Sequence, residues 1–183
     1  MAKRIFLIVG VFLFLCVLFR GCLYRQVVAY ESIGVRMNYK VTDNELNDCI
    51  NTSLENESEM NIDEIIERSL EITASELNFT TGKNDVDPNK LIHSKTAHCV
   101  GYAAFCAATC NDILKRCNLD RTWIATPHIG KLYFLGMNVH NWFDSSFLKD
   151  HDFVIIRNSE TGEIKAVDPT LYDYLFIEEV AVK

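Results

Sequence analysis

The hydrophobic period of this chain changes near residue 120, and that change limits the folds open to it. Before this point, apolar residues recur at helical spacing in two long segments, 62–78 and 98–117. After it, segments rich in aromatic and β-branched residues predict four strands, at 121–126, 131–137, 153–157 and 164–167. Helices followed by an antiparallel sheet are typical of an α+β fold. We therefore expect the small-residue helix at 98–117 to pack on that sheet as the central helix.

Capping residues mark where two of the helices begin. Thr42 followed by Glu45 has the spacing of a capping box and predicts a helix over 43–54. Asn61 and Glu64 repeat this spacing before the first long helix. We also expect a short strand at 33–39 and loops at 80–90 and 138–150.

The first 25 residues differ in composition from the rest of the chain. Two basic residues precede an uncharged apolar run at 5–19, and Arg20 follows it. The run alone is short for a spanning helix, which needs about 17–25 residues. Extending it to Tyr24, with Arg20 reaching toward the interface, gives a span of about twenty residues. We expect 1–25 to be an uncleaved signal anchor that ties the domain at 26–183 to a membrane, with the domain outside the cytoplasm.

Three alternatives to this anchor stay open. One is a cleaved signal peptide, for which 27–29 (Val-Val-Ala) is the best candidate cleavage site. Another is a lipid carried by Cys22. The last is a buried helix of a soluble protein, which the lack of an amphipathic pattern disfavours.

Composition excludes one class of partner. The chain has 183 residues, of which 49% are hydrophobic, so it can form one domain with a substantial core and a short appendage. Its net charge is −7, so it lacks the basic surface that nucleic acid requires.

The seven cysteines divide between the leader and the domain: Cys16 and Cys22, then Cys49, Cys99, Cys106, Cys110 and Cys117. Five domain cysteines fit one free nucleophile with two disulfides, and they also fit no disulfide at all. The last four are 7, 4 and 7 residues apart, which places them near one face of the central helix. We expect this stripe to pack in the core. Thiols along one helix lie too far apart to share an ion, so neither a metal nor a cofactor is expected.

Three residues have the settings that thiol catalysis needs. Cys99 opens the central helix, where unpaired N–H groups and the helix dipole favour a thiolate. His151 opens an apolar strand, and Asp168 closes the last one. Folding these strands about the tight turn at 158–162 makes Asp168 a diagonal neighbour of His151 on one face. An imidazole there can take the thiol proton, and a carboxylate can hold the imidazole in one tautomer.

These residues and their settings resemble the transglutaminase-like superfamily of papain-fold thiol enzymes. The similar stretches are 98–103 (His-Cys-Val-Gly-Tyr-Ala), the strand that begins at His151, and 167–170 (Val-Asp-Pro-Thr). The resemblance implies a papain-like, transglutaminase-like core at 96–173.

The resemblance also implies a role for each residue. Cys99 would be the nucleophile, His151 the base and acid, and Asp168 the orienting carboxylate. Many members of the family have an aromatic residue soon after the histidine, and His140-Asn141-Trp142 fits that local pattern. His140 is therefore the second candidate for the catalytic histidine.

The activity implied is acyl transfer from a peptide or protein substrate. Hydrolysis of an amide or peptide bond, as in a thiol protease, is the first expectation. A protein-glutamine transferase that crosslinks proteins is the sibling alternative. A catalytically inactive, membrane-tethered binding module of the same fold is the alternative from another class. Thiol–disulfide exchange is disfavoured, because the chain has no Cys-x-x-Cys pair.

Overall fold

The structure, a computed structural model, describes residues 2–55 and 59–183 and has an α+β architecture. The large sheet contains β1 (Val28–Val35), β4 (Trp123–Phe134), β5 (Met137–Asn138), β6 (His151–Asn158), β7 (Ile164–Val167) and β8 (Ala181–Val182). A second sheet pairs β2 (Asn78–Phe79) with β3 (Thr96–Ala97). The helices are α1 (Ala2–Leu18), α2 (Arg20–Val27), α3 (Asn44–Leu54), α4 (Ile62–Glu76), α5 (Pro88–Ser94), α6 (Cys99–Arg116) and α7 (Pro169–Leu175). Two 3-10 turns are η1 (Val139–Trp142) and η2 (Ser146–Leu148).

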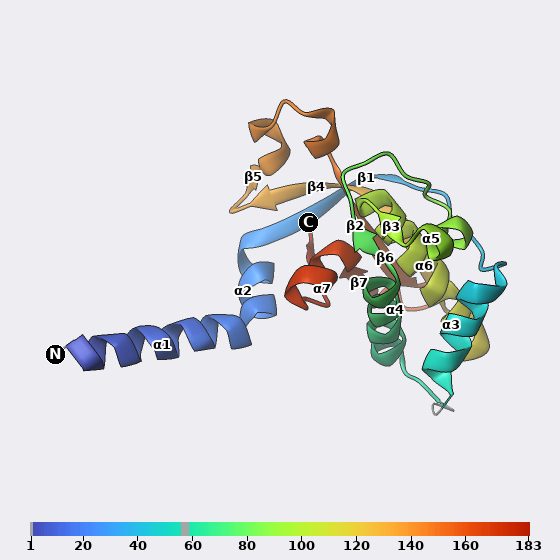
Figure 1. Ribbon diagram of the computed structural model, residues 1–183, viewed down its shortest axis with the longest axis horizontal. Helices are drawn as coiled ribbons and strands as arrows, with labels where there is room; N and C mark the ends of the chain where they lie inside the picture. The colour runs from blue at the N-terminus through green and yellow to red at the C-terminus, as the bar shows by residue number, and fades with distance from the viewer. Residues whose placement is uncertain (1, 56–58) are drawn as a thin grey trace.

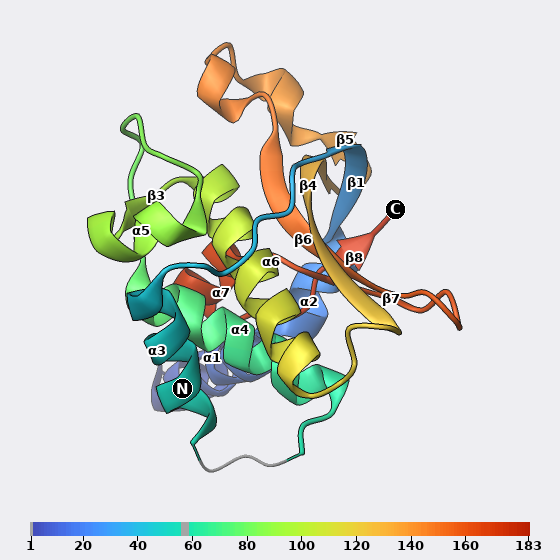
Figure 2. The same ribbon diagram turned by 90° about the vertical axis from the view of Figure 1, so that its right-hand side faces the viewer.

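The strands of the large sheet follow the order β7-β6-β4-β1-β8, and β5 pairs with β4. Helix α6 lies between this sheet and the helices α3, α4 and α5 (Figure 2). The α+β class and the central helix are as the sequence predicts. Helix α1 extends away from the body of the molecule, whereas α2 turns back onto it (Figure 1).

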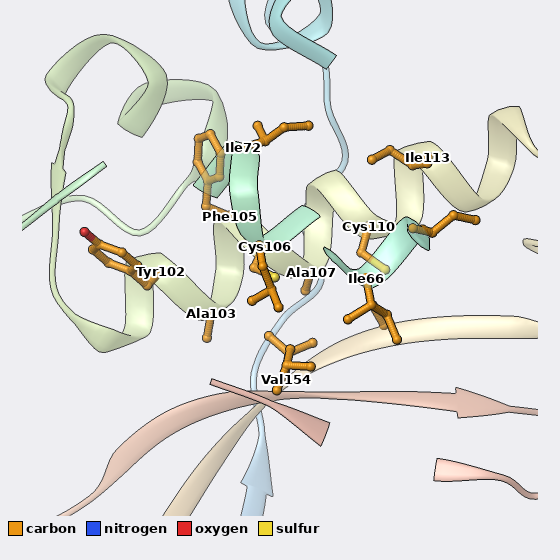
Figure 3. Close-up of a cluster of buried hydrophobic side chains, with 14 of the residues drawn as sticks. Ile66, Ile72, Tyr102, Ala103, Phe105, Cys106, Ala107, Cys110, Ile113 and Val154 are labelled. Carbon is orange, nitrogen blue, oxygen red and sulfur yellow. The ribbon is translucent and has the colours of Figure 1, made fainter. Parts of the chain in front are cut away.

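The main hydrophobic core surrounds α6, with α3, α4 and α5 on one side and the sheet on the other. Figure 3 shows Ala103, Cys106 and Ala107 of α6 on the side that faces Val154 of β6. Small side chains on α6 let the helix approach the strands closely, which increases dispersion contacts. Cys106 and Cys110 are both buried in this core, so they pack as expected.

A second, smaller core covers the opposite face of the sheet. Tyr30 of β1 and Phe153 and Ile155 of β6 are buried there, with Tyr24 of α2 packed against them. Alternate residues of β6 therefore serve two cores, because side chains along a strand point to opposite faces. This explains why β6 is an almost continuous apolar run.

The segments predicted as two strands at 121–126 and 131–137 form the single strand β4. Pro127 is tolerated because its carbonyl accepts the Arg36 N–H at 2.8 Å, so its missing N–H faces the end of β1. A Cβ on Gly130 would lie 2.8 Å from the carbonyl oxygen of His151. Only glycine fits this approach of β4 to β6, so the strand continues through both residues.

The strand directions in the sheet and the bounds of β1 also differ from those predicted. The sheet is mixed instead of antiparallel, because β8 pairs in parallel with β1. Strand β1 covers 28–35 instead of 33–39, since its first half has partners on both sides, in β4 and β8. A two-residue strand near the chain end has no sequence pattern long enough to predict it.

Helix starts are only partly as predicted. Asn61 caps α4 in a full capping box, as expected. The cap of α3 is Asp43, whose carboxylate accepts two backbone N–H groups, whereas the N–H of Thr42 donates to a side chain of α5. The loop predicted at 80–90 ends in α5, which Asp87 caps and Pro88 begins.

The single apolar helix expected to run through Tyr24 is broken, and α1 and α2 are bent by 76° at the break. Among the described residues, no one helix combines the length and apolar character that crossing a membrane requires, although the pair Val9–Leu18 and Arg20–Val27 does so together. The break has a physical reason, because the Arg20 guanidinium donates to carbonyl oxygens at the end of α7. This contact holds α2 against the domain.

Candidate functional site

Cys99 is the first residue of α6 and is 8% exposed. The preceding residue, His98, is extended and its side chain makes no capping hydrogen bond. The first bond of the helix runs from the Tyr102 N–H to the His98 carbonyl, so the N–H groups before Tyr102 have no helical partner. Gly101 allows this tight start, because a Cβ there would lie 2.8 Å from the Cβ of Ala97.

His151 and Asp168 form a direct pair beside this helix start. The Nε2–H of His151 donates to Oδ2 of Asp168 at 2.7 Å. Asp168 is 2% exposed and caps α7, since its Oδ1 accepts the N–H groups of Thr170 and Leu171 at 3.0 and 3.1 Å. Asp168 is thus both a helix cap and the partner of His151, and the cap fixes the plane of its carboxylate.

The strand register explains why these two residues meet. Val154 pairs with Val167 at the end of the β6–β7 ladder. Asp168 directly follows Val167 at the end of β7, and His151 begins β6 three residues before Val154, so the two lie diagonally beyond this pair as the turn at 158–162 predicts. Sequence reasoning therefore located this neighbourhood correctly.

Charge interactions hold the pair in its ionised form. The Cys99 thiol interacts with the His151 imidazole, and Nδ1 is the nitrogen left for it because Nε2 faces Asp168. Burial opposes the imidazolium, but Asp168 and Cys99 outweigh burial and raise the pKa of His151 well above its usual value. Burial likewise opposes the carboxylate, but His151 and Tyr30 lower the pKa of Asp168. At neutral pH the proton therefore resides on His151.

Cys99 and His151 both line a pocket of about 210 Å³. Its other walls are mostly apolar and come from β2, β4 and the 138–150 segment: Phe79, Leu132, Val139, Phe143, Phe147 and Leu148. The segment predicted as a loop at 138–150 thus supplies much of the pocket, held in shape by its two 3-10 turns. Trp142 from the same segment is 58% exposed and does not line the pocket.

His140, the second histidine candidate, lines this pocket but does not join the carboxylate. It is buried, and its Nδ1–H donates to the carbonyl oxygen of Leu148 at 2.7 Å. Burial lowers the pKa of His140, which therefore stays neutral at pH 7. The structure brings His151, and not His140, to Asp168.

Two partners of the site escaped sequence reasoning. Tyr30 donates its hydroxyl hydrogen to Oδ2 of Asp168 at 2.7 Å. Arg36 binds the fully buried Asp152 through Nε at 2.8 Å and Nη2 at 3.2 Å. A signal for the second pair was available, because an acid inside an apolar strand requires a partner. Nothing in the local pattern around Tyr30 identified it.

The other domain thiols have different surroundings. Burial raises the pKa of Cys110 to about 12 and raises the pKa of Cys106 further. Burial also raises the pKa of Cys49, to about 11. Cys49, Cys99, Cys106 and Cys110 are not in disulfides, so the five domain cysteines do not form the two disulfides that were one of the expectations. The thiol that faces an imidazole is Cys99.

Within residues 2–55 and 59–183, no group of three or more His, Cys, Asp or Glu side chains could hold a metal ion. Comparisons with models of protein families, with curated proteins and with solved structures find no match for the chain. The function is therefore argued from the geometry of this site.

Proposed function

We propose that this protein is a cysteine-dependent acyl-transfer enzyme with a Cys99–His151–Asp168 triad, and that it hydrolyses peptide or other amide bonds. One observation carries the proposal: the Cys99 thiol contacts the His151 imidazole in the wall of one mostly apolar pocket, and the same imidazole is hydrogen-bonded to the buried Asp168 carboxylate. The resemblance to transglutaminase-like, papain-fold enzymes supports it. So does the arrangement of a cysteine at the start of the central helix, a histidine at the start of β6 and an aspartate directly after the neighbouring strand β7.

The first step forms a bond between the Cys99 sulfur and the substrate carbonyl carbon. The reacting group is the Cys99 thiolate, because the proton of this pair is the one that His151 carries and Asp168 stabilises that imidazolium. The carbonyl oxygen becomes an oxyanion, which the unpaired N–H groups at the start of α6 can bind. One such donor is typically worth about 3 kcal/mol of barrier.

The second step releases the amine and then the acid. His151 gives its proton to the leaving amine as the C–N bond breaks and a thioester forms. Water then attacks the thioester, with His151 taking its proton, and the carboxylic acid leaves as Cys99 is restored. The raised pKa of His151 suits the acid step, because the group holds its proton until the amine needs it.

The pocket indicates the substrate side chain. A volume of about 210 Å³ is below the roughly 300–1,000 Å³ of pockets for drug-sized ligands, so it suits a single side chain. Asp150 also lines the pocket, but most of its walls are apolar, and these favour an apolar group because a polar group would lose its hydration against them. We therefore assign the pocket to an apolar residue next to the scissile bond.

The decisive experiment is thiol labelling of the full-length protein with a peptidyl vinyl sulfone that carries a phenylalanine. Mass spectrometry should find the label at Cys99, and Cys99→Ala should abolish it. Removing the base in His151→Ala should slow labelling by roughly 100-fold. Cys49→Ala is the matched control, since this half-buried thiol lies far from the pocket and its loss should change nothing.

Each alternative has its own outcome in this experiment. Label mainly at Cys49 or Cys117 would contradict the triad. A Cys99 that reacts no faster than a free cysteine, with no response to His151→Ala, would instead favour an inactive binding module. The transferase is tested in a parallel assay with a glutamine-containing peptide and an added primary amine, where transfer of the glutamine acyl group to the amine, with release of ammonia, in preference to hydrolysis would assign the protein-glutamine transferase.

We also propose that the first 25 residues anchor the protein to a membrane, with the domain outside the cytoplasm. The large apolar side chains of α1 between residues 9 and 18 are exposed, and patches of this kind mark membrane or protein contacts. The chain returns to the domain at Arg20, where α2 begins and contacts the end of α7. Flotation of the full-length protein with lipid vesicles tests the anchor, and protection of the domain from protease in intact cells would contradict its placement outside.

A further inference from the structure

A chain of hydroxyl groups connects helix α2 to the carboxylate of the site. The Tyr30 hydroxyl donates to Oδ2 of Asp168 at 2.7 Å, the same oxygen that accepts from His151. The Tyr24 hydroxyl lies 2.8 Å from the Tyr30 hydroxyl. Because the hydrogen of Tyr30 goes to Asp168, Tyr24 must donate to Tyr30. The order is therefore Tyr24, Tyr30, Asp168, His151 and Cys99.

Packing fixes the position of Tyr30, the middle residue of this hydrogen-bonded series. Tyr30 is 1% exposed. Its ring meets the His151 ring edge-on, with centroids 6.2 Å apart, and lies 5.1 Å from the Phe153 ring. A buried hydroxyl in such a setting needs a partner, and the Tyr30 hydroxyl has two, Tyr24 of α2 and Asp168 at the start of α7.

Helix α2 also contacts the far end of the helix that Asp168 begins. Arg20 donates from Nη2 to the Phe176 carbonyl at 2.9 Å and from Nε to the Leu175 carbonyl. These oxygens belong to the C-terminal end of α7, where a cation also meets the negative end of the helix dipole. Helix α2 thus contacts the C-terminal end of α7 directly through Arg20, and it reaches the Asp168 cap of α7 through Tyr30 of β1.

We propose that helix α2 is a positioning element of the site: Tyr24 and Tyr30 set how much of the Asp168 charge His151 receives, while Arg20 holds the opposite end of α7. This inference rests on the proposed function and extends it, because it makes the N-terminal segment part of the chemistry. It also predicts that cleavage at 27–29 would remove Tyr24 and Arg20 from the site.

The physical effect follows from two donors sharing one oxygen. A hydroxyl that donates to Oδ2 draws part of the carboxylate charge away from His151. Donation from Tyr24 makes the Tyr30 hydroxyl a stronger donor, since linked hydrogen bonds polarise one another. Other titratable groups near His151 include Cys99 of α6, His140 of η1 and Asp150, which lines the same pocket, and none of them contributes a hydroxyl group between Tyr24 and Asp168.

The test measures the pKa of His151 by NMR of its imidazole in the full-length protein in detergent micelles. Tyr30→Phe should raise the pKa of His151 by roughly half a unit or more, because Asp168 then concentrates its charge on His151. Tyr24→Phe should move it in the same direction by a smaller amount. Tyr133→Phe is the matched control, since its hydroxyl donates to Glu31 away from the site, and it should leave the pKa unchanged.

The outcomes separate the parts of the proposal. An unchanged pKa of His151 in both Tyr24→Phe and Tyr30→Phe overturns it. If the pKa of His151 shifts in Tyr30→Phe but not in Tyr24→Phe, the effect on Asp168 comes from Tyr30 only. This result overturns the role of α2. The same samples are labelled at Cys99, so loss of the proposed function appears as an unreactive wild-type Cys99, independently of the His151 titration.

Discussion

Replacing Asp168 with asparagine keeps the volume of the side chain but removes its charge. The asparagine oxygen can still accept the N–H groups of Thr170 and Leu171, so the cap of α7 should survive. Its amide nitrogen then faces two donors, the Nε2–H of His151 and the hydroxyl of Tyr30. His151 must adopt the other tautomer or lose this contact, which makes Asp168→Asn a test of the ion pair.

The size of the effect follows from the geometry of the pair. Two unit charges 2.7 Å apart attract by about 6 kcal/mol at an effective dielectric constant of about 20. The loss of hydration of both buried groups offsets part of this attraction, and breaking a buried pair generally costs about 3–5 kcal/mol. Because the cap is retained, we expect the free energy of unfolding to fall by about 3 kcal/mol. The pKa of His151 should fall by about 2 units.

The pH dependence has a definite sign. The pKa of His151 is raised by folding, so its contribution is complete below about pH 6.5 and is lost as pH rises through the folded value. The pKa of Asp168 is lowered, so its contribution is complete above about pH 4 and is lost as pH falls through the folded value. The stability difference between wild type and Asp168→Asn should therefore be largest between about pH 4 and 6.5.

Urea unfolding followed by circular dichroism, repeated from acid to alkaline pH, measures this difference. Asp43→Asn is the matched control, because Asp43 also caps a helix and pairs with a histidine, His93, but does so in solvent. Asp43→Asn should lower the free energy of unfolding much less than Asp168→Asn does. A stability difference for Asp168→Asn that stays constant across the whole pH range would refute the ion pair and leave Asp168 as a helix cap only.

Three further substitutions test the frame around the site. Gly130→Ala places a methyl group 2.8 Å from the His151 carbonyl and should lower the free energy of unfolding by about 1–3 kcal/mol in urea; a wild-type midpoint would contradict the close approach. Arg36→Gln leaves the buried Asp152 without its cation and should lower the free energy of unfolding by about 2–3 kcal/mol. Arg36→Lys keeps the charge and should lower it less, so equal losses in both variants would argue against a charge effect. Asn61→Ala removes a capping box and should lower the free energy of unfolding, measured by calorimetry, by about 1 kcal/mol. An unchanged melting temperature would show that the cap does not stabilise α4.

Features governed by nearby residues were predictable. The capping box of Asn61 and the long helix after it appear as expected, since a cap depends on residues within one turn. The central helix, predicted over 98–117, is observed over Cys99–Arg116. The turn at 158–162 set the register of its two strands, and that register was enough to bring His151 near Asp168.

Predictions failed where a distant partner overrides the local pattern. The pattern at 121–137 indicated two strands, yet pairing with both β1 and β6 carries β4 through Pro127 and Gly130. The apolar N-terminal run suggested one helix, yet Arg20 binds carbonyl groups at the far end of the chain and the helix breaks there. Local propensity is a weak prior in both cases, because tertiary contacts supply more free energy.

The sequence by itself determined the inventory of the site: a cysteine at a helix start, and a histidine and an aspartate on strands joined by a tight turn. Only the tertiary structure decided what surrounds them. Tyr30 reaches Asp168 across 138 positions, and Arg36 reaches Asp152 across 116. No periodicity encodes such pairs, because they depend on which faces of the sheet meet which helices after the chain has folded.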